Sequence, residues 1–136
     1  LSFTGQAKSE LHTLFDALQE ILNLTVESYC KNDPQLARQV EPLEEVIDDL
    51  TAEIRDRHIQ RLHKGECTIE MGFVLTDLMT NCERVSDHCS NIAICVIQIK
   101  DSEFGPHDYL NVLKNSAQPE FVKSFMAYQD KYTIKE

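Results

Sequence analysis

The sequence has few of the residues that build sheets and tight turns. Among its 136 residues there is no tryptophan, there are four glycines and four prolines, and no run of alternating β-branched side chains occurs. Strands are enriched in β-branched and aromatic residues, so this composition argues against a β-sheet fold. Leucine, glutamate, glutamine, lysine and alanine, which favour helices, are plentiful. We therefore expect an all-α protein.

Basic residues are also scarce. Thirteen lysines and arginines stand against 23 aspartates and glutamates, and the formal net charge is -10 at pH 7. The phosphate backbone of nucleic acids repels a chain of this charge, so we expect no nucleic-acid partner. The sequence also has no glycine-rich phosphate loop and no nucleophile with a base and an orienting group, and it predicts no enzyme.

Long apolar runs and paired cysteines are missing as well. The longest apolar stretch, residues 92–99, is interrupted by Gln98 and is far shorter than a membrane span. The cysteines are odd in number and form no Cys-x-x-Cys pair, which is typical of a reducing compartment. The chain begins at Leu1 rather than at methionine, from which we expect a longer parent protein or a processed chain.

Apolar spacing predicts three long helices. The first runs from about residue 4 to 31, the second from Asp33-Pro34 to about Gly65, and the third from about residue 68 to 100. Asp33 is suited to the N-cap and Pro34 to the first helical position. Pro42 lies inside the second segment, where the helix must kink or restart because proline lacks the backbone donor.

A fourth element resumes helical spacing near the C-terminus, through Phe121, Phe125, Tyr128 and Tyr132. Because the connections between the long helices are short, consecutive helices are expected to pack antiparallel. We expect a single domain over residues 1–136, an antiparallel three-helix bundle of about residues 3–100. The appended element of about residues 106–136 extends it to as many as four helices.

Two apolar patterns define the predicted packing surfaces. The first helix has a broad apolar stripe, suited to neighbours on two sides. Its members are Leu11, Leu14, Phe15, Leu18, Ile21, Leu22, Val26 and Tyr29. The third helix has an apolar seam at alternating steps of four and three, which predicts a long packed helix. Its members are Met71, Leu75, Leu78, Cys82, Val85, Cys89, Ile92, Val96 and Ile99.

Two pairs of carboxylates share the same spacing. Glu44 and Asp48 lie four residues apart on the second helix, and Glu83 and Asp87 repeat that spacing on the third. Like charges at this spacing destabilise a helix by about 0.2 to 0.5 kcal/mol unless a cation compensates them. Four hard oxygen donors on adjacent helices are suited to iron, zinc, magnesium or manganese. The alternative is a solvated acidic face on which Arg84 neutralises Asp87.

A basic cluster interrupts the acidic chain near the end of the second helix. Arg55, Arg57, His58 and Arg61 are candidates to contact an anion or a partner. In the alternative interpretation these charges cap the helix C-terminus and pair with neighbouring acids. The acids in question are Glu53, Asp56 and Glu66.

The third helix contains a string that identifies a family. Residues 83–93, Glu-Arg-Val-Ser-Asp-His-Cys-Ser-Asn-Ile-Ala, strongly resemble the signature of PhoU-like domains, and residues 40–48 resemble the companion helix. Residues 57–62, 65–70 and 72–75 are similar to the C-terminal PhoU-like region of bacterial sodium/phosphate cotransporters. The resemblance covers about residues 3–110.

This resemblance implies a three-helix unit that is usually present twice and regulates phosphate uptake. Some PhoU proteins hold iron or zinc clusters on Glu/Asp-x-x-x-Asp motifs, which implies iron or zinc at Glu44, Asp48, Glu83 and Asp87. Only one unit is present here, so a second copy must complete a two-unit arrangement. We expect the partner to be the membrane transport part of a parent cotransporter or a second PhoU-like unit, and the isolated chain to form a homodimer.

The expected role is that of a non-catalytic regulatory domain of a sodium-dependent phosphate cotransporter, cytoplasmic and at the inner face of the membrane. One alternative is a free-standing PhoU-type metal-binding regulator of phosphate uptake signalling. Another is a purely structural helical dimerisation module.

Overall fold

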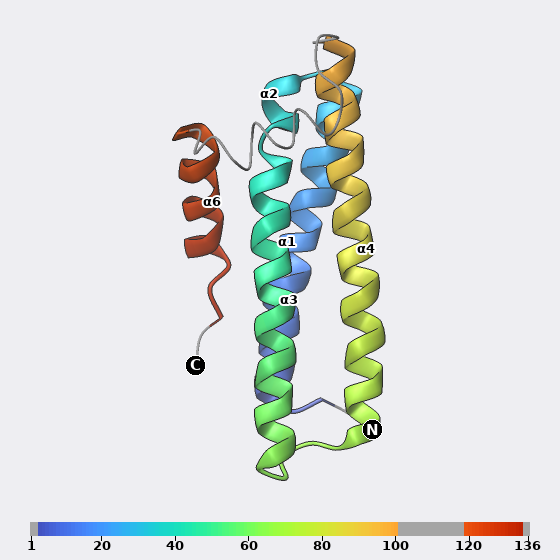
Figure 1. Cartoon of the computed structure of the whole chain (residues 1–136), viewed down its shortest axis with the longest axis vertical. Coiled ribbons are helices and arrows are strands. Elements are labelled where there is room, and N and C mark those ends of the chain that lie inside the picture. The colour runs from blue at the N-terminus through green and yellow to red at the C-terminus, as the bar shows by residue number, and fades with distance from the viewer. Residues whose placement is uncertain (1–2, 101–118, 135–136) are drawn as a thin grey trace.

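A computed structural model describes residues 3–100 and 119–134, and these residues form an all-helical bundle. The helices are α1 (Gly5–Cys30), α2 (Pro34–Ala37), α3 (Val40–His63), α4 (Ile69–Lys100) and α6 (Pro119–Lys131). Helices α1 and α4 run in the same direction and α3 runs antiparallel to both (Figure 1). The expected three-helix core is therefore confirmed. The expected C-terminal element is described only from residue 119 onward.

The signals predicted at Asp33, Pro42 and Gly65 mark observed helix ends, and Thr4 supplies a further cap. Thr4 caps α1 by accepting a hydrogen bond from the Ala7 amide, and Asp33 caps α2 by accepting one from Gln35. Gly65 follows α3 with φ of 74°, the left-handed conformation that ends many helices. Pro42 is the third residue of α3, where its missing N–H has no helical partner to lose, so the chain restarts rather than kinks.

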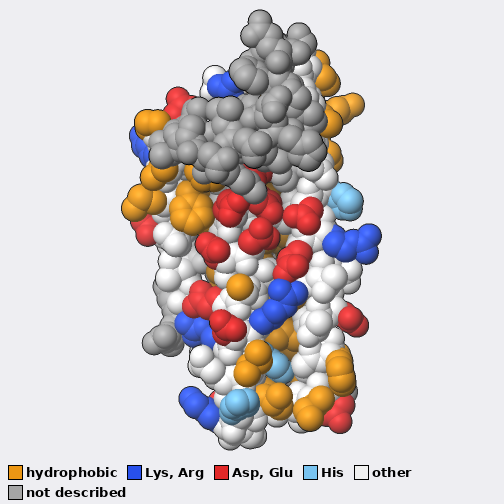
Figure 2. All heavy atoms as spheres, in the orientation of Figure 1, with side chains coloured by type: hydrophobic (Ala, Val, Ile, Leu, Met, Phe, Trp, Pro, Cys, Tyr) orange, Lys and Arg blue, Asp and Glu red, His pale blue; other side chains and the backbone are white. Residues whose placement is uncertain are grey.

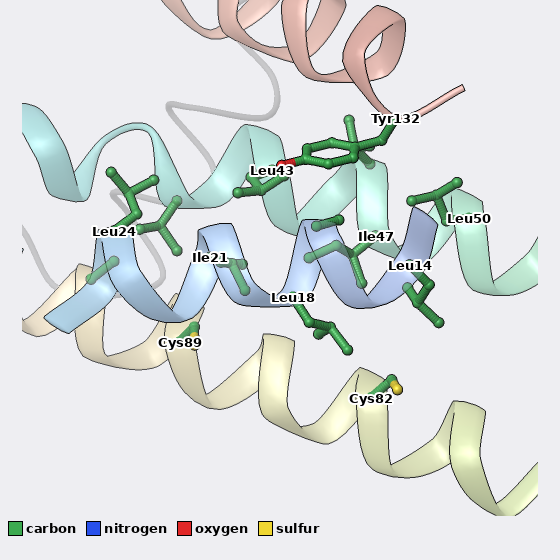
Figure 3. Close-up of a cluster of buried hydrophobic side chains, with 14 of the residues drawn as sticks. Leu14, Leu18, Ile21, Leu24, Leu43, Ile47, Leu50, Cys82, Cys89 and Tyr132 are labelled. Carbon is green, nitrogen blue, oxygen red and sulfur yellow. The ribbon is translucent and has the colours of Figure 1, made fainter. Parts of the chain in front are cut away.

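The core lies between α1, α3 and α4. Leu14 and Ile21 of α1 are fully buried, as are Leu43 and Ile47 of α3. Figure 3 shows them with Cys82 and Cys89 of α4, and both thiols are free and buried. The two cysteines behave here as small apolar side chains.

The predicted seam of α4 is wrong at Ile92 and Ile99 and right at Val96 between them. Ile92 is 43 % exposed and Ile99 71 % exposed, and Leu78 and Val85 are half-buried. A straight helix has 3.6 residues per turn, so a strict seven-residue repeat drifts by about 20° per heptad around its axis. Buried positions follow the 3.6-residue period instead. They are Met71, Leu75, Met79, Cys82, Ser86, Cys89, Ala93, Ile94, Val96 and Ile97.

The predicted stripe of α1 is likewise only half buried. Phe15, Leu22, Val26 and Tyr29 are exposed, whereas the other four members lie in the core. The sequence predicted neighbouring helices on two sides of α1. Among the described residues, neighbouring helices bury only one part of its apolar stripe.

Helix α6 packs against α3, on the flank of the bundle away from α4 (Figure 1). Tyr132, just after α6, is buried and its hydroxyl donates to Glu20 of α1. Lys131 makes an ion pair with the same carboxylate at 2.7 Å, and Tyr128 donates to Gln39 at 3.3 Å. None of the helices described here has a segment apolar and long enough for a membrane crossing.

Candidate metal centre between α3 and α4

Carboxylates gather on the surface over α3 and its border with α4. Figure 2 shows acidic side chains crowded across the middle of this face. The first turns of α3 contribute Glu41, Glu44, Glu45 and Asp48, and α4 contributes Asp87. Their spacing places them together, because residues three, four and seven apart on a helix share one face.

Glu44 is the most strongly perturbed member of this group. Its side chain is 6 % exposed. Burial raises the pKa of Glu44 to about 9, and the hydrogen bond with Asp48 and the nearby charge of Asp48 act in the same direction. Burial also raises the pKa of Asp48, although its hydrogen bond with Glu44 opposes that effect. The pair therefore holds a proton on Glu44 at neutral pH, with Asp48 as the acceptor.

Three carboxylates converge across the helix boundary. Ligand oxygens of Glu44, Asp48 and Asp87 all lie within 4.8 Å of one another. A second group, Glu41, Glu44 and Glu45, meets the same limit on α3 alone. An oxygen-only donor set fits a hard divalent or trivalent cation, and the exposed position of Asp87 leaves room for water ligands.

Glu83 belongs to neither of these two groups. Its carboxylate accepts a hydrogen bond from Arg55 Nη1 at 2.5 Å, in an ion pair between α4 and α3. Of the four ligands expected from the sequence, the structure thus brings Glu44, Asp48 and Asp87 together and gives Glu83 a cationic partner.

Sequence reasoning missed Glu41 as a member of the acidic cluster. Glu41 is buried, and it accepts a hydrogen bond from Ser90 Oγ of α4 at 2.5 Å. The available signal was spacing, because Glu41 precedes Glu44 by three residues and Ser90 follows Asp87 by three. Both residues stand within strings that resemble the family, but neither belongs to a Glu/Asp-x-x-x-Asp pair.

The basic cluster is divided among several contacts. Arg61 makes two hydrogen bonds to the fully buried Glu10, at 2.9 and 3.0 Å. Arg57 pairs with Glu53 at 3.0 Å, as the capping interpretation expected, whereas Arg55 bonds to Glu83. These contacts spread the cluster over three partners and form no common exposed patch.

His58 is buried beside the loop that follows α3. Its ring nitrogens lie 3.7 and 3.8 Å from Cys67 Sγ. Burial lowers the pKa of His58, and the charge of Arg61 lowers it further. A small cavity of about 150 Å³ adjoins His58, Arg61 and Cys67 near the start of α1.

Comparison with known proteins gives the family. The PhoU domain matches residues 11–96, well over half of the chain. The chain is 26 % identical over 91 residues to the phosphate-specific transport system accessory protein PhoU homolog 1 of Thermotoga maritima. This match covers 67 % of the chain but 39 % of the relative, so the chain spans about two fifths of the relative's length. The chain has no significant match among solved structures. On the strength of the domain match, the chain belongs to the PhoU domain family.

Proposed function

We propose that this chain is a non-catalytic regulatory module of phosphate uptake whose acidic face binds a metal ion. The regulatory part is supported by membership of the PhoU domain family and by the similarity to a phosphate transport accessory protein. The metal part is carried by one observation, the convergence of Glu44, Asp48 and Asp87 within 4.8 Å. In this proposal the metal takes the place of the proton held on Glu44.

Iron or zinc is the proposed metal. Glu44 and Asp48 supply oxygens from α3 and Asp87 from α4, so an ion at this position ties the two helices together. Glu83 becomes a ligand either through its second oxygen or by leaving Arg55, to which Oε1 is bonded at 2.5 Å. The metal supplies positive charge to a cluster that otherwise repels itself.

The proposed cellular setting is the cytoplasmic side of the membrane. There the module serves as the regulatory domain of a sodium-dependent phosphate cotransporter and packs on its transport part or on a second PhoU-like unit. Residues 57–62, 65–70 and 72–75 support this setting by their likeness to cotransporter sequences. The alternatives are a free-standing PhoU-type regulator of phosphate uptake signalling and a structural dimerisation module.

Elemental analysis by plasma mass spectrometry tests the metal part. We expect near-stoichiometric iron or zinc in protein purified without chelators, and loss of that metal in the Glu44→Gln/Asp48→Asn variant. Asp56→Asn, which removes an exposed acid on the same helix, is the matched control. If the parent protein and the double variant both contain only background metal, the proposed metal binding is wrong. The bundle would then act as a docking module without a metal.

The cellular setting needs a separate experiment. Membrane segments upstream of Leu1 in the parent gene are expected for the cotransporter domain and contradict the free-standing regulator. Phosphate uptake in cells is expected to become insensitive to phosphate supply when the bundle is deleted from the parent protein. Unchanged uptake control after deletion would contradict a regulatory role.

A further inference from the structure

His58 and Cys67 form a thiol–imidazole pair at the end of the bundle where α3 leads into α4 (Figure 1). His58, near the end of α3, is buried, and Cys67, in the loop before α4, is half-buried. Cys67 Sγ lies 3.7 Å from Nδ1 and 3.8 Å from Nε2 of the ring. The thiol also donates to the His58 carbonyl oxygen at 3.6 Å. The carboxylate cluster between α3 and α4 includes neither residue.

Two glycines permit this close approach of thiol and imidazole. Gly65 adopts the left-handed conformation after α3, and the chain turns there so that Cys67 returns to the side of His58. The His58 ring lies against α4 at Gly72, where a Cβ would come within 3.1 Å of Nε2. A larger residue at position 72 would therefore displace the ring. Because Nε2 faces α4, Nδ1 is the nitrogen that remains for a ligand beside Cys67.

The distance between the two side chains matches that of two ligands on one metal ion. Zinc binds cysteine sulfur at about 2.3 Å and histidine nitrogen at about 2.05 Å. At the tetrahedral angle these bonds hold sulfur and nitrogen about 3.6 Å apart. Cys67 Sγ and His58 Nδ1 are 3.7 Å apart, so an ion fits between them after a small turn of the ring.

The cavity beside the pair supplies a third donor and space for water. Its volume is about 150 Å³, and Glu66 borders it together with His58 and Cys67. A water molecule occupies roughly 30 Å³ in the liquid, so an ion and its water ligands fit in this space. Sulfur, imidazole nitrogen and carboxylate oxygen are the three donor types that zinc takes in proteins, often with water in the fourth position.

The charges around the cavity favour a cation over an anion. Both terminal nitrogens of Arg61 donate to Glu10, which offsets the charge of the guanidinium, and Glu66 adds a carboxylate. Burial lowers the pKa of His58, the charge of Arg61 lowers it further, and the charge of Glu10 opposes both. The ring is therefore neutral at pH 7 and has a lone pair for a metal.

We propose that His58, Cys67 and Glu66 form a second metal site, which takes a divalent cation of the zinc type and ties the α3–α4 loop to α3. The Cys67 thiol loses its proton to solvent when the cation binds, because the thiolate is the ligand. The site goes beyond the proposed function, since it shares no residue with the carboxylate cluster and about four turns of α3 separate Glu44 from His58. With three protein ligands and an open position the ion exchanges readily, so the test adds metal to the protein.

Titration with cobalt(II), followed by absorption, tests the proposal. Cobalt takes the place of zinc in such sites, and a thiolate ligand gives a sulfur-to-cobalt charge-transfer absorption that carboxylates do not give. The protein is the full 136-residue chain with Glu44→Gln/Asp48→Asn, stripped with a chelator and kept reduced by a phosphine. These two substitutions disable the carboxylate cluster, so a failure of this site and a failure of the proposed metal centre are recorded separately.

We expect a saturable sulfur-to-cobalt absorption that added zinc abolishes. Cys67→Ser is expected to remove it, and His58→Gln is expected to weaken cobalt binding at least roughly tenfold. Glu66→Gln is expected to weaken binding by a smaller factor. Cys95→Ser and His63→Gln, at exposed positions on α4 and α3, are the matched controls and are expected to leave the titration unchanged.

Thermal unfolding of each metal-free variant verifies that the fold is retained. If no sulfur-to-cobalt absorption develops up to near-millimolar cobalt, the proposal is wrong and the pair is a packing contact. The proposal is also wrong if the absorption persists in Cys67→Ser, or if His63→Gln weakens cobalt binding as much as His58→Gln. Unchanged affinity in Glu66→Gln would overturn its assignment as the third ligand.

Discussion

Glu10 and Arg61 form a buried bidentate ion pair that ties the beginning of α1 to the end of α3. The guanidinium donates to both carboxylate oxygens, at 2.9 and 3.0 Å, and Glu10 is fully buried. The two residues are 51 positions apart in the sequence. This contact therefore sets the relative position of the first turns of α1 and the last turns of α3.

Removing one member of that pair is expected to be costly. Arg61→Met leaves the Glu10 carboxylate buried without its bidentate partner, and we expect a loss of about 3 kcal/mol in the free energy of unfolding. Gln6 at 3.3 Å and Arg57 at 3.9 Å remain near the Glu10 carboxylate and do not replace the bidentate contact. Glu10→Leu in the same chain removes this poorly compensated buried charge, so the double variant is expected to recover most of the loss. Urea unfolding measures all three proteins.

The control for this prediction is Lys31→Met, which breaks the exposed pair with Glu27. Exposed pairs contribute little, so the expected change is below about 0.5 kcal/mol. A loss for Arg61→Met no larger than that of the control would show that the buried pair contributes little to stability.

The second prediction concerns pH and Glu44. In the folded protein its pKa is raised to about 9, whereas a free glutamate ionises near 4.5. The folded state therefore binds the proton more tightly. The stability that protonated Glu44 contributes is fully present below pH 4.5 and is lost as the pH rises toward 9.

Glu44→Gln cannot ionise and still offers a donor to Asp48. We expect it to stabilise the metal-free protein by roughly 1 to 3 kcal/mol at pH 7 and to flatten the decline in stability between pH 5 and 9. Chemical unfolding at a series of pH values measures this, with Asp56→Asn as the exposed control. An identical pH dependence in Glu44→Gln and in the parent protein would contradict a raised pKa.

The helices were predictable because their signals are local. Asp33, Gly65 and Pro42 mark a cap, a helix end and a restart through backbone chemistry that involves only near neighbours. The exposure of Ile92 and Ile99 was not predictable in this way. A seven-residue repeat rotates slowly around a straight helix. Which of its members are buried depends on where the neighbouring helices lie, and the sequence of one helix does not specify that.

In the candidate site, too, local spacing was predictable and contacts between helices were not. The spacing of Glu44, Asp48 and Asp87 predicted the acidic face, and the structure brings their oxygens together across two helices. Spacing did not reveal that Glu83 bonds to Arg55, because that contact depends on the relative height of α3 and α4. Long-range pairs of this kind require the packed arrangement of the helices.

The third prediction separates Asp87 from Glu83 as metal ligands. Asp87 lies with Glu44 and Asp48, whereas Glu83 has a cationic partner. We expect Asp87→Asn to weaken the binding of added zinc at least roughly tenfold, since it removes one charged ligand of three. Glu83→Gln is expected to change the affinity only slightly.

Titration calorimetry with zinc on chelator-stripped protein measures both affinities. The proton on Glu44 must leave when the metal binds, so we also expect zinc affinity to rise with pH. Equal losses in the two variants would mean that Glu83 binds the metal as well as Asp87. Unchanged affinity in Asp87→Asn would exclude Asp87 as a ligand.

The fourth prediction compares two buried serines. Ser86 of α4 and Ser28 of α1 are both fully buried. The Ser28 hydroxyl donates to the Thr25 carbonyl oxygen at 2.8 Å, whereas the Ser86 hydroxyl has no hydrogen-bond partner among the residues that the structure describes. A buried hydroxyl without a partner loses its hydrogen bonds to water on folding, and no hydrogen bond within the protein replaces them.

Each serine is replaced by alanine, so the change in helix propensity is the same at both positions. We expect Ser86→Ala to stabilise the bundle and Ser28→Ala to be less favourable by about 1 kcal/mol, the net value of one hydrogen bond. Urea unfolding of the two variants gives this difference directly. If Ser86→Ala proves as costly as Ser28→Ala, the Ser86 hydroxyl must be bonded in solution. A water at the α4 face of the core would then be the partner to look for.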